Sequence, residues 1–156
     1  MLFLYTMNTR ELIDLYVDDE FNDKSKEAAL RTFLISLESD LDYAPASSRL
    51  SFHHAYSGGL LDHIVEIMSA MESMAASLGD TFGEVSGDSI RTVSILHDIH
   101  KARDINGNRQ YVENVLNSGN ISEKIPFKTN SEYYNWSEFK LVKDLENSQY
   151  LDSNGE

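Results

Sequence analysis

The spacing of hydrophobic positions predicts helices over the first two thirds of the chain. Asn8 or Thr9 can cap a short helix, because both side chains accept hydrogen bonds from the free backbone amides at a helix start. A second helix is predicted from about Ser25 to Asp40, with one apolar face formed by Leu30, Phe33, Leu34 and Leu37. The segment from Asp42 to Gly59 contains Pro45 and a Gly-Gly pair, so it is predicted to be a loop.

Two further helices are predicted after this loop. The first begins near Leu60 and ends before Gly79, and its apolar positions are Leu61, Ile64, Val65, Met68, Met71 and Met74. We interpret its methionines as core filler. Ser86 or Asp88 caps the next helix, for which the expected buried stripe is Ile90, Val93, Leu96 and Ile99.

The pattern changes after Asp104, where turn signals alternate with short apolar pieces. We expect these pieces to pair as a small β-arm near residues 109–129, and a last helix to run from about Ser137 to Asn147. The predicted fold class is mainly α, a helical bundle with this one β-arm. We expect a single domain over residues 1–156.

The net charge of the chain bears on which kinds of ligand it can bind. The chain has 13 basic and 26 acidic residues and a net charge of −13. Basic side chains supply most of the affinity for long nucleic acids, so such a partner is disfavoured. A small phosphorylated ligand, such as a nucleotide, stays open because a metal ion can supply positive charge locally. The absence of cysteine fits a cytoplasmic protein, and the apolar start, residues 1–7, is too short to span a membrane. The sequence does not define an oligomeric state.

All five histidines lie between positions 53 and 100. His97 and Asp98 are adjacent in an otherwise apolar helical run, where an uncompensated carboxylate would cost on the order of several kcal/mol. A divalent ion would compensate that charge. Successive helical residues point about 100° apart, so a third ligand must come from another element, and His63 on the preceding helix is the candidate. A hydrogen-bonded structural histidine is the alternative interpretation at each position.

Two segments carry a family resemblance: HHAYSGGLLDH at residues 53–63 and LHDIHK at residues 96–101. Together they resemble the HD-domain phosphohydrolase superfamily over roughly residues 50–104. The chain is most similar to members with an HHAYxGGLLxH segment, among them YhaM-like 3′–5′ exoribonucleases and phage-encoded HD proteins. The resemblance implies a helical HD domain that holds a divalent ion (Mn, Fe, Zn, Co or Mg) through His63, His97 and Asp98.

The resemblance also implies roles in catalysis. Asp98 would bind the metal and orient the attacking water, and Lys101, together with Arg103, would balance charge on the substrate phosphate. His54 would contact the substrate. The alternatives are that Lys101 is a surface lysine near a helix end, that His54 fixes the loop, and that Arg103 belongs to a solvated charged face.

Two departures from the family pattern affect this interpretation. His100 stands where the family usually has the glycine of HDIGK, so its ring could narrow the pocket or add a ligand. The family's last metal-binding aspartate has no recognisable counterpart. Asp104, Asp144 and Asp152 are the candidates, and the alternative is a chain that ends before the helix carrying that aspartate.

Three functions therefore compete. The acidic charge favours a metal-dependent phosphohydrolase that cleaves phosphate esters of nucleotides. A 3′–5′ nuclease stays open through the family resemblance, although the sequence shows no basic track for a strand. A degenerate HD domain that binds a nucleotide or a protein without turnover is suggested by His100 and by the missing aspartate.

Overall fold

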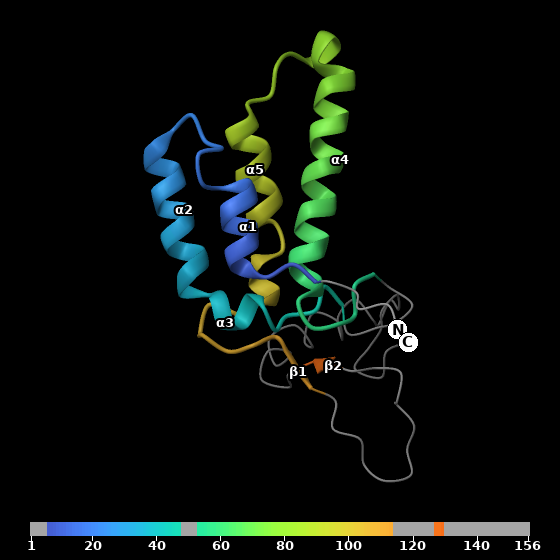
Figure 1. Cartoon of the computed structure of the whole chain (residues 1–156). Coiled ribbons are helices and arrows are strands. Elements are labelled where there is room, and N and C mark those ends of the chain that lie inside the picture. The colour runs from blue at the N-terminus through green and yellow to red at the C-terminus, as the bar shows by residue number, and fades with distance from the viewer. Residues whose placement is uncertain (1–5, 48–52, 114–126, 130–156) are drawn as a thin grey trace.

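The computed structural model describes residues 6–47, 53–113 and 127–129. The elements in order are α1 (Thr9–Tyr16), α2 (Lys24–Ser36), α3 (Glu38–Leu41), α4 (Gly59–Phe82), α5 (Gly87–Leu96), the 3₁₀ helix η1 (Ile99–Lys101), β1 (Tyr111–Glu113) and β2 (Phe127–Thr129). The long helix α4 runs antiparallel to α5, and α1 and α2 stand on the other side of α5 (Figure 1). This mainly helical architecture confirms the predicted fold class.

One hydrophobic core joins these helices. Its most deeply buried members are Leu12, Ile13, Leu34, Leu41, Leu60, Leu61, Ile64, Met68 and Ile95. Helix α5 packs along α4, and the buried Ser94 hydroxyl donates to the Met71 sulfur at 3.3 Å. Because the two helices are antiparallel, the end of α5 lies beside the first turns of α4. The predicted ligand residues are found in those two places.

The start of α1 follows its local sequence. Asn8 is the N-cap, and its side chain accepts from the Glu11 amide while the Glu11 carboxylate accepts from the Asn8 amide. The predicted second helix instead consists of α2 and α3, which are separated at Leu37. Phe33, which the sequence assigns to the apolar face with Leu30 and Leu34, is exposed on α2.

Helix α4 is longer than predicted. It continues through Gly79 to Phe82, because a glycine inside a helix costs only about 1 kcal/mol relative to alanine. The helix ends at Gly83, whose φ of +86° suits glycine far better than any other residue. The far end of α4 extends past α1 and α2 (Figure 1), so Met74 is 60% exposed and the prediction that it fills the core is wrong.

The predicted buried stripe of α5 is wrong for Val93 and Leu96, which are both exposed. The buried positions are Ile90, Ser94 and Ile95 together with Asp88. Helical periodicity defines the faces of a helix, but the contact with α4 decides which face is covered. That contact is made through the Ser94 side of the helix.

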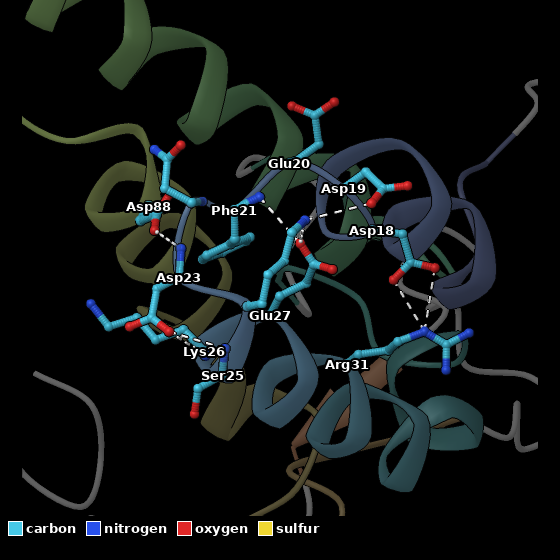
Figure 2. Close-up of polar contacts among 12 residues, drawn as sticks. Asp18, Asp19, Glu20, Phe21, Asp23, Ser25, Lys26, Glu27, Arg31 and Asp88 are labelled. Carbon is cyan, nitrogen blue, oxygen red and sulfur yellow. Dashed lines mark hydrogen bonds and ion pairs between the residues drawn. The ribbon is translucent and has the colours of Figure 1, made fainter.

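The turn between α1 and α2 is tied to the start of α5 (Figure 2). One carboxylate oxygen of Asp88 accepts from the Asn22 amide and the other from the Asp23 amide, each at 3.0 Å. These two backbone hydrogen bonds hold the pKa of Asp88 below its ordinary value. Asp88 therefore links segments that lie far apart in the sequence.

The predicted β-arm is confirmed. Strands β1 and β2 pair antiparallel, with Val112 opposite Lys128. The last predicted helix, Ser137 to Asn147, lies outside the described residues. Among the described residues, no helix combines the length and the apolar character that crossing a membrane requires.

Candidate metal centre

His63, His97 and Asp98 converge in space from two elements. His63 lies in the second turn of α4, whereas His97 and Asp98 follow the last residue of α5. The Nε2 atoms of the two histidines are 3.3 Å apart, and Asp98 Oδ2 lies 3.4 Å from His63 Nε2 and 3.6 Å from His97 Nε2. In the part of the chain that the structure describes, these residues form the one group of three or more His, Cys, Asp or Glu side chains close enough to share an ion.

The break between α5 and η1 allows the side chains of His97 and Asp98 to face the same way. The sequence predicted both residues within a continuous helix, but α5 ends at Leu96 and Asp98 has φ −117° and ψ 11°. The chain then re-enters a short 3₁₀ helix. The helical spacing of about 100° between neighbours therefore does not apply, and both side chains can face His63.

The hydrogen bond at Nδ1 of His97 suits metal binding. Its Nδ1 lies 2.7 Å from the Ser94 carbonyl oxygen, which can only accept a hydrogen bond. Nδ1 therefore carries a proton, and in a neutral ring Nε2 presents its lone pair towards His63 and Asp98. A backbone carbonyl that orients a ligating imidazole in this way is a usual feature of protein metal sites.

The surroundings of His63 favour the neutral ring. Burial lowers the pKa of His63, and the neighbouring His53 lowers it further. The side chain is 12% exposed. A neutral imidazole is the form that binds metals, so His63 is ready to act as a ligand near pH 7.

Asp98 is held in its charged form by Lys101. Burial alone would raise the pKa of Asp98, but the hydrogen bond and charge of Lys101 outweigh it, and the pKa is lowered. Lys101 Nζ lies 2.7 Å from Asp98 Oδ2 and also donates to the Ala46 carbonyl at 3.0 Å. Lys101 thus connects the His-Asp pair to the loop before α4.

The distances within the triad fit a metal ion. Two ligand atoms that each lie about 2.1 Å from a tetrahedral ion are separated by about 3.4 Å. The three separations of 3.3, 3.4 and 3.6 Å match this value. Two imidazole nitrogens and a carboxylate oxygen are a donor set suited to first-row divalent ions. The cluster therefore belongs to the class of mixed histidine–carboxylate centres that could hold such an ion.

A network of side-chain hydrogen bonds fixes the loop beside the triad. We call its members, His54, Tyr56, Asp62 and Glu66, the loop clamp. His54 Nδ1 lies 2.6 Å from the Tyr56 hydroxyl, and His54 Nε2 lies 2.8 Å from Glu66 Oε2. The Tyr56 hydroxyl donates to Asp62 Oδ2 at 2.8 Å. Burial and this hydrogen bond raise the pKa of Tyr56, so the hydroxyl keeps its proton.

Sequence reasoning missed Tyr56, Asp62 and Glu66. The signal available was the spacing of Asp62 and Glu66, four residues apart and therefore on one face of α4 next to His63. Their partners come from the loop, and a pattern along one helix does not reveal them.

The structure places the other predicted residues as follows. The Arg103 guanidinium pairs with the buried Asp40, which Arg109 also contacts at 2.6 Å. Asp104 Oδ1 accepts from the Asn106 and Asn108 amides, each at 2.8 Å, and so closes a turn. His100 lies on η1 and is not part of the triad. Asp144 and Asp152 lie outside the described residues.

The chain is similar to a curated phosphodiesterase. It is 39% identical over 62 residues to the dihydroneopterin 2′,3′-cyclic phosphate phosphodiesterase of Methanocaldococcus jannaschii. The matched region covers 39% of this chain and 24% of that protein, so the chain spans about a quarter of the relative's length. No family model matches the chain. No solved structure matches it either.

Proposed function

We propose that this chain is a metal-dependent phosphohydrolase of the HD type, a single domain that cleaves phosphate esters of nucleotides. The observation that carries the proposal is the triad of His63, His97 and Asp98, with separations of 3.3–3.6 Å between its ligand atoms. The phosphodiesterase similarity supports the same reaction class. The net charge of −13 favours a small substrate over a long strand.

The residues would divide the chemistry among them. His63, His97 and Asp98 would hold a Mn, Fe, Zn, Co or Mg ion, which when bound supplies Lewis acidity to a phosphoryl oxygen and lowers the pKa of water. Asp98 Oδ2 faces the two histidines and Lys101. No described residue donates to its Oδ1, which can therefore accept a proton from the attacking water and orient it. Lys101 keeps the carboxylate charged and in place.

The test combines metal analysis with a substrate panel. The purified protein is loaded with each ion in turn and assayed on nucleoside mono- and triphosphates and 2′,3′-cyclic nucleotides. We expect Asp98→Asn to abolish metal-dependent ester cleavage while the helical circular dichroism signal stays unchanged. Asp18→Asn is the control, because Asp18 pairs with Arg31 on the surface between α1 and α2. Full activity in Asp98→Asn would place the reaction elsewhere.

Cyclic phosphodiesters are the second candidate substrate class, since the M. jannaschii relative is named for a 2′,3′-cyclic phosphate. The panel separates them from monoesters and triphosphates directly. A protein that binds metal and nucleotide tightly but cleaves no ester would instead be a binding-only HD domain. Preferential cleavage of RNA from its 3′ end would favour the nuclease.

A further inference from the structure

The cationic side chains predicted to contact a substrate phosphate are already engaged. Lys101 Nζ contacts both Asp98 and the Ala46 carbonyl, at 2.7 and 3.0 Å. Arg103 pairs with the buried Asp40. Each would have to give up a partly buried ion pair before turning towards a ligand, and losing such a pair is costly. A residue without such an ion pair can therefore donate to a phosphoryl group at the triad at a lower cost.

His54 is engaged as well. Both of its ring nitrogens have partners, the Tyr56 hydroxyl and the Glu66 carboxylate. Its backbone is also constrained, because His54 has a φ of +50°, a conformation that non-glycine residues rarely adopt. A Cβ at Gly59 would lie 2.2 Å from the His54 carbonyl oxygen, so only glycine allows this close approach. Strained backbone of this kind is concentrated at functional sites.

The loop clamp holds the preceding residue, His53, against the triad. The His53 ring centroid lies 4.4 Å from that of the metal-ligand candidate His63, with the rings tilted by 39°. His53 is nevertheless exposed. Within the described ranges no hydrogen bond engages its ring. Among the described residues, His53 is thus an imidazole without a hydrogen-bond partner that packs directly on a triad residue and faces solvent.

We propose that His53 is a substrate-contact residue, whose ring N–H donates to a non-bridging oxygen of a phosphoryl group bound at the triad. This inference rests on the proposed function and adds the residue that recognises the phosphate. An imidazole presents at least one N–H in either protonation state, so the contact needs no change of charge. Hydrogen bonds to an anionic oxygen are roughly twice as strong as those between neutral groups.

The experiment measures binding of inorganic phosphate to the manganese-loaded protein by titration calorimetry. We expect His53→Ala to weaken phosphate binding by about tenfold, the loss of one hydrogen bond to a charged group. His53→Gln and His53→Asn each keep an N–H donor, and at least one of them should restore most of the affinity. His100→Ala is the matched control, because His100 is also an exposed histidine beside Asp98. Within the part of the chain that the structure describes, its ring makes no contact with His63. It should bind phosphate like the wild type.

Two further measurements decide the role. Manganese affinity should be equal in all four variants and the wild type, and a loss in His53→Ala would overturn the proposal by making His53 a metal ligand. Unchanged phosphate affinity in His53→Ala would also overturn it. If an ester is cleaved, His53→Ala should raise KM far more than it lowers kcat. Failure of the proposed function would appear differently, as phosphate binding without cleavage of any ester.

Discussion

The carboxylate of Asp98 has two possible counter-charges, Lys101 and a bound cation. We expect Lys101→Met to lower the unfolding free energy of the metal-free protein by about 1–3 kcal/mol, because the partly buried carboxylate loses its partner. A divalent ion compensates the same charge, so saturating metal should remove most of this deficit. Thermal and urea unfolding with and without metal measure the difference.

Arg31→Met is the control for the unfolding measurements on Lys101→Met. Arg31 pairs with Asp18 at 3.1 Å, but both side chains are substantially exposed, as Figure 2 illustrates. Exposed ion pairs contribute about 0–1 kcal/mol, and this one lies outside the triad. Its small deficit should be equal with and without metal. Equal Lys101→Met deficits in the two conditions would show that Lys101 acts only on the loop, through Ala46.

At the scale of elements, the start of α4 requires a residue without a Cβ at position 59. A Cβ at Gly59 would meet the His54 carbonyl at 2.2 Å, whereas a Cβ at Gly79 in the same helix would meet nothing within 4 Å. We expect Gly59→Ala to destabilise the protein by about 1–3 kcal/mol, as overpacking does, and to weaken metal binding by displacing the loop. Gly79→Ala should stabilise it by up to about 1 kcal/mol. Urea unfolding of both variants checks the opposite signs, and equal effects would contradict the close approach.

The contact between the α1–α2 turn and α5 should depend on pH. The pKa of Asp88 is lowered by its hydrogen bonds to the Asn22 and Asp23 amides of that turn. A lowered folded pKa means that the stabilisation is present above the ordinary value of about 3.9 and is lost as pH falls through the folded pKa. Asp88→Asn should therefore melt below the wild type near neutral pH, and the gap should close under acid conditions. Glu72→Gln, on an exposed position of α4, should show no such gap.

The elements that the sequence predicted correctly are those specified locally. The start of α1 follows from Asn8 and Glu11, three residues apart, and the β-arm follows from turn residues between short apolar runs. The prediction that Val93 is buried was wrong, because its exposure depends on which face of α5 packs against α4. His97 and Asp98 could be named because their chemistry is unusual in an apolar run, and His63 because it lies on the preceding helix and matches the family segment. Their convergence, and the contacts of His54 and Lys101, depend on the break after Leu96 and on the path of the loop, which periodicity does not describe.

At the scale of the whole molecule, the net charge of −13 opposes the approach of a polyanion. Charges on the surface act over about 10 Å at 0.1 M salt and over about 3 Å at 1 M salt. Added salt therefore screens repulsion between this protein and a nucleic acid strand. Proteins that bind strands through basic residues show the opposite dependence, because salt weakens their phosphate contacts.

We accordingly expect the metal-loaded protein to cleave a mononucleotide ester with a higher kcat/KM than a single-stranded RNA or DNA of about twenty nucleotides. This comparison is made at about 0.05 M salt, where charges act over about 14 Å. Raising the salt should increase any rate on the strand and leave the rate on the mononucleotide nearly unchanged, because the repulsion grows with the number of phosphates. A matched series of one, two, five and about twenty nucleotides under these conditions measures the trend. Faster turnover of the longer strands, with a rate that falls as salt rises, would reveal a basic track and favour the nuclease over the small-substrate phosphohydrolase.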